Sequence, residues 1–229
     1  MVRKAWLVCG ILASFVYVAM TLVVGMLWDG YRSADQAISE LSAIGAPTRP
    51  LWMLLGTVYA VLMVAFGWIV WKTAPPNRAL RIAGALIMAQ TVFGYFWPPM
   101  HQRAVLAVGG GTLTDSLHLV WATVSGLFFL SAVGFGAWAF GKRFRIYSIA
   151  TLVILLASGV WNGTYVSLIQ ANLPTPWAGV WERITSTAYM VWVAGLATTM
   201  LRIRNPVVAR GRKDAVAAQT VRLTSRSRV

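Results

Sequence analysis

Long uninterrupted apolar runs dominate the chain, and short polar segments separate them. A membrane-spanning helix needs roughly 20 apolar residues at about 1.5 Å per residue. Six runs reach this length, at about residues 5–28, 51–71, 79–97, 114–140, 146–169 and 179–201. Backbone polar groups find no water inside a bilayer, and the runs lack the short alternating segments of a β-barrel, so helices are expected. The pattern predicts an all-α integral membrane bundle of six transmembrane helices.

The composition of the 229-residue chain agrees with this pattern, because 58% of the residues are hydrophobic and only 11% are charged. Soluble domains are about 45–50% apolar and about 25% charged, and disordered chains are less apolar still. A soluble globular fold and a disordered chain are therefore excluded. Cys9 is the only cysteine, which also excludes an intramolecular disulfide.

Basic residues outnumber acidic ones by 20 to 6, which gives a formal net charge of +14. Most of them fall on the side of the two predicted termini, and only Arg32, Arg49, Arg103 and Arg183 fall on the other side. Cytoplasmic loops of membrane proteins carry such an excess of Lys and Arg. Both termini are therefore predicted to be cytoplasmic, in a multi-pass cell-membrane protein whose partner is the lipid bilayer. Because topology accounts for the charge, no nucleic-acid partner is expected.

The final segment, 205–229, is polar and rich in Arg. We expect a six-span domain over residues 1–204, followed by this segment as a disordered cytoplasmic tail. Two roles are open for the tail. It either remains solvated and helps to orient the protein, or it contacts anionic lipids of the inner leaflet at about 1 kcal/mol per basic residue.

Ionisable residues other than Lys and Arg gather on the predicted outer side. Only Asp214 lies in the tail, and the remaining carboxylates and both histidines fall on the outer side: Asp29, Asp35, Glu40, Asp115, Glu182, His101 and His118. Acidic residues contribute little to topology, so topology alone does not require this arrangement. The polar chemistry of the protein is expected at this one face.

The first outer loop contains a helix-start signal. Ser33 and Gln36 have the spacing of a capping box, and apolar residues follow at helical intervals. The pattern predicts a short amphipathic helix at about 34–44 that lies in the membrane interface. Ser39 and Glu40 fall in its middle, and Glu40 belongs either to a site or to a solvated helix face.

The fourth span begins with Asp115 and His118, which share one helix face because they are three residues apart. Three interpretations are open for this pair: a general-base dyad, half of a metal site, or a structural ion pair. A metal site would need further ligands, and the sequence contains only two histidines and one cysteine. No metal and no cofactor is identified from the sequence.

Polar residues also occur within the spans. Glu182, Ser186 and Tyr189 form a stripe on the last span, Asn162 lies in the outer half of the fifth span, and Gln90 lies near the middle of the third. Each alone fits an interhelical contact. Together they suggest a polar pocket that opens outward or toward the outer leaflet.

Three segments resemble an uncharacterised family of prokaryotic membrane proteins, the "domain of unknown function 998" family. They are the run 38–49 (ISELSAIGAPTR), the Asp115–His118 start of the fourth span, and the run 179–185 (GVWERIT). The resemblance covers about residues 5–202 and extends more distantly to Frag1/DRAM-type six-span proteins, some of which are linked to lipid-anchor remodelling. It implies a prokaryotic cytoplasmic membrane and an extracytoplasmic polar site that contains Glu40, His118 and Glu182, and it implies no particular reaction.

These observations define the candidate site. The candidate catalytic residues are Glu40, Asp115, His118 and Glu182, and the candidate substrate-binding residues are Ser39, Arg49, His101, Arg103, Arg183 and Tyr189. Three functions are open: handling of or action on lipid headgroups at the outer face, a non-catalytic assembly or stress-response role, and transport of a small solute or protons.

Overall fold

A computed structural model describes residues 2–74 and 77–202, and within these ranges the secondary structure is helical, with no strand. The long helices are α1 (Val2–Met26), α2 (Arg49–Lys72), α3 (Arg78–Tyr95), α5 (Leu113–Ala137), α6 (Lys142–Gly163) and α8 (Ala178–Arg202). The short ones are η1 (Ile38–Ser42), α4 (Arg103–Ala107) and α7 (Val166–Gln170). The predicted 146–169 span is divided between α6 and α7, and the predicted tail lies outside the described residues.

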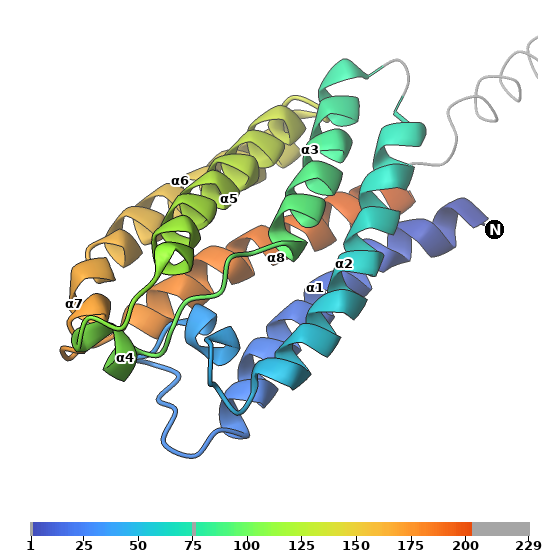
Figure 1. The fold of residues 1–229 in the computed structure, drawn as a ribbon. Coiled ribbons are helices and arrows are strands. Elements are labelled where there is room, and N and C mark those ends of the chain that lie inside the picture. The colour runs from blue at the N-terminus through green and yellow to red at the C-terminus, as the bar shows by residue number, and fades with distance from the viewer. Residues whose placement is uncertain (1, 75–76, 203–229) are drawn as a thin grey trace, which may run out of the picture.

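The long helices form a closed ring (Figure 1). Each packs against the next long helix in the chain, from α1 through α2, α3, α5 and α6 to α8, and α8 packs against α1. Successive connections lie at alternate ends of the ring, so neighbouring helices run in opposite directions. Every long helix therefore has one face toward the ring axis and one face away from it.

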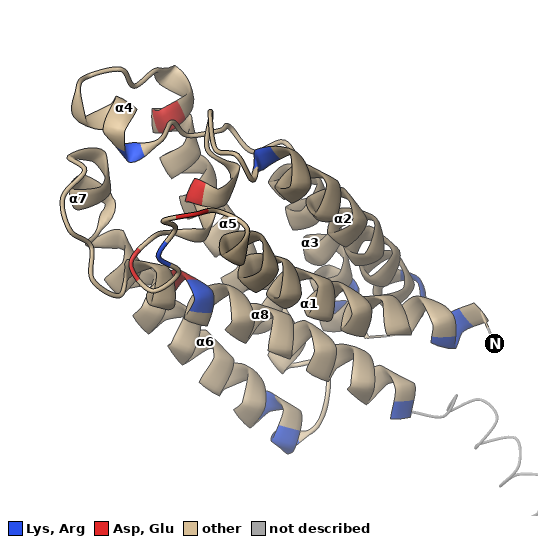
Figure 2. Cartoon of the chain, turned by 90° about the horizontal axis from the view of Figure 1, so that it is seen from below, with Lys and Arg blue, Asp and Glu red and all other residues tan. Residues whose placement is uncertain are grey.

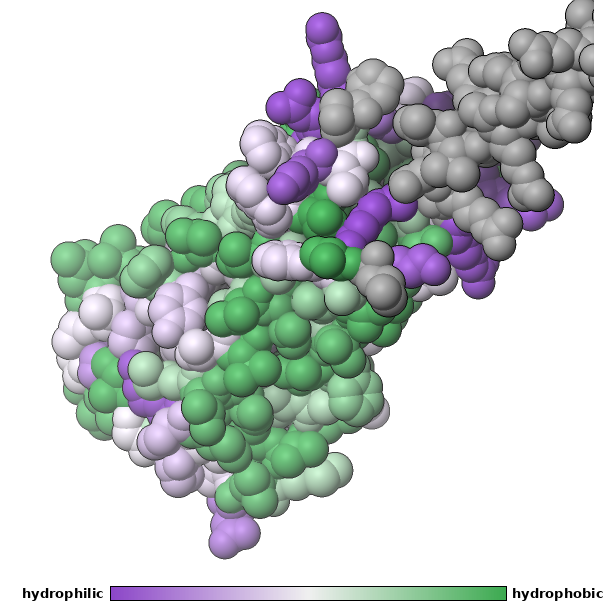
Figure 3. All heavy atoms as spheres, turned by 90° about the vertical axis from the view of Figure 1, so that its right-hand side faces the viewer, coloured by the Kyte–Doolittle hydropathy of each residue, from purple (hydrophilic) through white to green (hydrophobic). Residues whose placement is uncertain are grey.

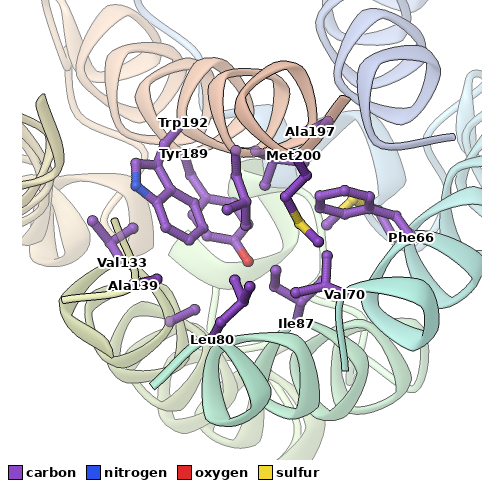
Figure 4. Close-up of a cluster of buried hydrophobic side chains, with 14 of the residues drawn as sticks. Phe66, Val70, Leu80, Ile87, Val133, Ala139, Tyr189, Trp192, Ala197 and Met200 are labelled. Atoms are coloured by element: carbon purple, nitrogen blue, oxygen red, sulfur yellow. The ribbon is translucent and has the colours of Figure 1, made fainter. Parts of the chain in front are cut away.

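Large side chains fill one half of the ring axis. Phe66, Tyr189 and Trp192 are fully buried, and aliphatic side chains from α2, α3 and α5 pack around them (Figure 4). The outward faces are apolar too, as the broad hydrophobic surface in Figure 3 shows. Phe15 and Val61 are 72% and 65% exposed on these faces. Apolar residues on both sides are expected when the outer face contacts lipid.

Five helices of the described chain are long and apolar enough to cross a membrane: α1, α2, α5, α6 together with α7, and α8. The protein is therefore membrane-embedded. The remaining predicted span, 79–97, corresponds to α3, which forms a helix of 18 residues but carries Arg78, Arg81 and Gln90. It is not among the five.

A close backbone approach holds α3 in the ring. Gly67 of α2 faces Gly84 of α3, and a Cβ atom added at Gly84 would lie 2.6 Å from the backbone nitrogen of Trp71. Small residues at such contacts let helices in membranes pack closely. The two glycines therefore let the backbones of α2 and α3 approach closely at this point.

Charged residues separate to the two ends of the ring (Figure 2). One end, which we call the basic end, carries the described Lys and Arg residues of the α2–α3 and α5–α6 connections, the start of α1 and the end of α8. The other end holds the longer connections with η1, α4 and α7, and we call it the loop end. All described acidic residues lie at the loop end: Asp29, Asp35, Glu40, Asp115 and Glu182.

The predicted amphipathic helix at 34–44 is wrong in length and in type. Only η1 is helical there, and it is a 3-10 helix. The backbone of the preceding residues binds α8 instead of continuing a helix, since Val180 N donates to Ala34 O at 3.1 Å and Arg183 Nη1 donates to Ser33 O at 2.7 Å. Ile38 and Leu41 are buried against the bundle, so this segment lies within the protein rather than in the interface.

Substitution of Gly84 by Ala is expected to destabilise the protein by about 1–3 kcal/mol, because the added methyl group meets backbone that cannot move aside. Unfolding of the purified protein in a mixed-micelle denaturation series measures the change. The control is Gly134→Ala, since a Cβ atom at Gly134 meets nothing within 4 Å. Equal stability of the two variants would contradict the close α2–α3 contact.

Candidate functional site

A buried ion pair lies at the centre of the loop end. Glu40 of η1 accepts from Arg103 of α4 in a bidentate geometry, with Nη2 to Oε1 at 2.6 Å and Nε to Oε2 at 2.8 Å. Glu40 is 3% exposed. The solvated-face interpretation of Glu40 is therefore wrong, and its carboxylate is fully engaged within the protein.

The same two residues hold the loops together. Arg103 also donates to Thr175 Oγ1 at 2.7 Å, and Thr175 in turn donates to Asp35 O at 2.7 Å. Glu40 accepts from the backbone nitrogen of Ala37 at 2.8 Å. The pair joins the connections before η1, before α4 and before α8, so Glu40 and Arg103 act as a structural unit.

Asp115 does not pair with His118. Its carboxylate accepts from His101 N at 2.7 Å, lies 2.9 Å from His101 Nδ1, and accepts from Thr112 N at 2.7 Å. The last of these bonds caps the start of α5. The dyad interpretation of Asp115 and His118 is wrong because the connection before α5 folds back and places His101 nearer to the carboxylate.

His118 lies one turn further into the bundle and is buried. Its Nδ1 is 2.7 Å from the carbonyl oxygen of Pro98, and its ring packs against Trp121 at a centroid distance of 5.5 Å. A carbonyl can only accept, so Nδ1 carries a proton and, in the neutral imidazole, Nε2 is the acceptor nitrogen. His118 is thus fixed in orientation by the chain before α4.

Glu182 and Arg183 of α8 bind two neighbouring parts of the first loop. Glu182 Oε2 accepts from Ile38 N, at the start of η1, at 2.6 Å. Arg183 donates to Ser33 O at 2.7 Å and to the Tyr31 hydroxyl at 2.9 Å. Burial raises the pKa of Tyr31 to about 12, and the Arg183 guanidinium opposes that rise. The Tyr31 hydroxyl therefore remains protonated and donates to Ala37 O at 2.9 Å.

A cavity of about 650 Å³ occupies the loop-end half of the ring axis. Its roof is η1, and its walls come from all six long helices. Most of the lining is apolar, and the polar residues of the lining include Ser39, Ser42, Gln90, Thr91, His118, Ser125, Asn162, Glu182, Thr185 and Ser186. Small-molecule sites have about this size and this mixture of an apolar wall with a few polar groups.

Four buried polar atoms in residues of this wall have no hydrogen-bond partner among the residues that the structure describes. They are Gln90 Oε1, Trp97 Nε1, Ser125 Oγ and Asn162 Oδ1. Buried polar groups in folded proteins are nearly always paired, so each of these atoms calls for a partner. The four residues line the same cavity, so its wall contains polar groups that the described residues leave unpaired.

The structure divides the predicted site residues into two groups. Ser39, His118 and Glu182 line the cavity. The others make contacts outside the lining. Glu40 and Arg103 form the buried ion pair, and Asp115 is hydrogen-bonded to His101. Arg183 binds the first loop, Arg49 binds the carbonyl oxygen of Ser42, and Tyr189 lies in the core, where its ring centroid is 4.0 Å from that of Phe129.

Trp97 lines the cavity but was not predicted as a site residue, because in the sequence it fits an interfacial tryptophan at the end of a span.

Within the described residues, no group of three or more metal-ligating side chains comes together. The sequence-level alternative of a metal site at Asp115 and His118 gains no further ligand from this arrangement.

Replacement of Arg103 by Ala is expected to cost about 3–5 kcal/mol of stability, because it leaves the Glu40 carboxylate buried without its partner. The matched control is Arg32→Ala. Arg32 pairs with Asp35 at 2.7 Å, but its side chain is 79% exposed, so the loss is expected to be below about 1 kcal/mol. Thermal unfolding in detergent compares the two, and a similar small loss for both would contradict the structural role of the buried pair.

One comparison with known proteins gives a match. No curated protein and no solved structure matches the chain. The family described as "Protein of unknown function (DUF998)" matches residues 11–199, which is most of the chain and includes η1, the cavity lining, four complete long helices and most of α1 and α8. The chain therefore belongs to this family.

Proposed function

We propose that the protein binds the polar head of a membrane amphiphile in the cavity at its loop end. One observation carries the proposal: a largely apolar cavity of about 650 Å³ is lined by four residues that each contain a buried polar atom without a partner among the described residues. An apolar wall accommodates hydrocarbon, and the polar atoms offer hydrogen bonds that hydrocarbon cannot make. A molecule with both properties satisfies both parts of the lining.

The charges on the cavity wall limit which polar head groups fit there. Among the described residues that line the cavity there is no Lys or Arg, and Glu182 is its one carboxylate. Phosphate and carboxylate groups are bound mainly by Arg, Lys and helix N-termini. A head with hydroxyl, ester or amide groups fits better, because Gln90 Oε1 and Asn162 Oδ1 accept hydrogen bonds while Trp97 Nε1 donates.

In this proposal the protein binds the ligand and does not catalyse a reaction on it. Of the candidate catalytic residues, Glu40 is engaged in an ion pair with Arg103, and Asp115 is hydrogen-bonded to His101. His118, through Nε2, and Glu182 are the two candidate residues in the wall that could accept a proton from a bound hydroxyl. This supports a handling protein, in which the charged residues build the scaffold and the wall holds the ligand.

The packing of the basic half argues against a solute channel. Phe66, Tyr189 and Trp192 have no exposed surface, and they fill the ring axis between the cavity and the basic end (Figure 4). A path across the membrane would have to displace them. The second candidate is a non-catalytic assembly role, which the mutual pairing of the loop-end charges favours.

We also propose that all six long helices span the membrane, with the basic end in the cytoplasm of a prokaryotic cell. The support for a sixth span is the ring itself: α3 lies between α2 and α5, and its 18 residues extend about 27 Å at 1.5 Å per residue. The support for orientation is the concentration of Lys and Arg at the basic end. The 205–229 tail then lies in the cytoplasm.

Gln90→Leu and His118→Leu are expected to lower the retention of diacylglycerol by about tenfold, which corresponds to one lost hydrogen bond of about 1.4 kcal/mol. Native mass spectrometry of protein exchanged into micelles that contain diacylglycerol measures the bound fraction. Gln170→Leu is the control, because Gln170 is exposed at the end of α7 and does not line the cavity.

Two results would contradict the proposal. One is equal retention of diacylglycerol by the wild type and Gln90→Leu. The other is preferential retention of phosphatidylglycerol, whose phosphate finds no basic side chain on the described wall.

Reporter fusions test the topology. A periplasm-dependent reporter inserted at Gly110, in the connection between α4 and α5, is expected to be active, and the same reporter at Gly141, between α5 and α6, is expected to be inactive. The positions lie on the two sides of a single helix. The reverse pattern would overturn the orientation, and activity at both positions would overturn the assignment of α5 as a span.

A further inference from the structure

The cavity wall is interrupted between α5 and α6. Several residues of the lining are at the same time exposed at the surface of the ring, and most of these belong to the two helices. Leu127 is 58% exposed, Leu156 is 52% exposed and Val160 is 71% exposed. A side chain that both lines a cavity and reaches the surface marks a place where the cavity opens.

The neighbouring helix contacts are closed. On the α3 side, Trp121 stacks on Phe93 and donates from Nε1 to its carbonyl oxygen at 3.2 Å. On the α8 side, the hydroxyl groups of Ser158 and Thr185 are 2.7 Å apart and join α6 to α8. Among the described residues, no such bond joins α5 to α6 at this depth, so the opening lies between these two helices.

Glycines keep the opening free. Gly126 of α5 and Gly159 and Gly163 of α6 line the cavity, and a Cβ atom added at any of them would meet nothing within 4 Å. Most helix-contacting glycines of the ring are different, as Gly84 shows, because a Cβ atom there collides with backbone. These three glycines therefore border empty space and do not serve close packing.

The roof is closed, in contrast. The segment η1 is held from three directions, by Arg103 on Glu40, by Glu182 on Ile38 and by the Ile44 N to Met100 O bond at 2.7 Å. Entry from the loop end would break buried, charged contacts. Entry between α5 and α6 breaks none of them, and both helices are apolar enough to lie in the hydrocarbon.

We propose that the ligand enters the cavity sideways from the membrane, through the opening between α5 and α6, and leaves its hydrocarbon chain in that opening. This rests on the proposed function and adds the source of the ligand. The head reaches Gln90, Ser125 and Asn162, whose unpaired atoms lie around the cavity, while Leu127, Leu156 and Val160 border the chain. The ligand is therefore a membrane lipid with an uncharged head and not a free, water-soluble compound.

Blocking the opening after folding tests this route. In a Cys9→Ser background, which removes the only cysteine, Thr123→Cys introduces a thiol at an exposed position of the cavity lining on α5. The purified protein is labelled with a bulky maleimide. Loading with diacylglycerol from phosphatidylcholine vesicles is then followed over time by native mass spectrometry. The matched control is labelled Val153→Cys, on an exposed face of α6 that does not line the cavity.

Labelled Thr123→Cys is expected to load at least about tenfold more slowly than labelled Val153→Cys and to approach the same final occupancy, because the label narrows the opening while Gln90, Ser125 and Asn162 are unchanged. Substitutions that narrow the opening provide a second test. The double variant Gly126→Leu/Gly159→Leu is expected to load diacylglycerol more slowly than the wild type. Gly134→Leu, in the other half of α5, is expected to load at the wild-type rate.

Equal loading rates in the labelled Thr123→Cys and Val153→Cys proteins would overturn the lateral route and leave the binding proposal standing. Absence of diacylglycerol from the unlabelled protein would overturn both. Loss of final occupancy with an unchanged initial rate would overturn the route as well, because a blocked entrance alters the rate first.

Discussion

The pairing of Glu40 with Arg103 is the interaction on which the loop end depends. A carboxylate and a guanidinium buried without each other would each cost several kcal/mol. Their bidentate contact, together with Thr175 and the backbone of Ala37 and Asp35, satisfies nearly all their hydrogen-bonding groups. Three connections that are far apart in sequence are thereby fixed relative to one another. The roof of the cavity has its position because this pair is satisfied.

Much of the fold follows from the sequence, because the rules that decide it are local. Apolar runs of sufficient length become helices in a membrane, and each predicted span overlaps one long helix of the ring, although the span at 146–169 also extends into α7. The site is less accessible to such rules. Asp115 binds His101 rather than His118, and Ser33 gives its carbonyl oxygen to Arg183 rather than starting a helix. Both outcomes depend on where distant segments meet, which residue spacing does not encode.

The size of the side chains divides the ring into two functional halves. Toward the basic end the axis is filled by Phe66, Tyr189 and Trp192. Toward the loop end the same helices contribute glycines to the wall: Gly56, Gly94, Gly126, Gly159 and Gly163. The sizes of these side chains can be read from the sequence. Which of them face the ring axis depends on the orientation of each helix, so the polar residues within the spans indicated a pocket but not its shape.

The adjacent residues Glu182 and Arg183 have a mechanical consequence. Successive residues of a helix point about 100° apart, so the two side chains grip the first loop from different sides of α8. Gly179, one turn earlier, lets the backbone of that loop lie directly on the helix. The roof is therefore anchored on α8 as well as on α4, where Arg103 binds Glu40. A tilt of α8 that carried the roof with it would strain the buried Glu40–Arg103 pair, so the two anchors together oppose movement of η1 over the cavity.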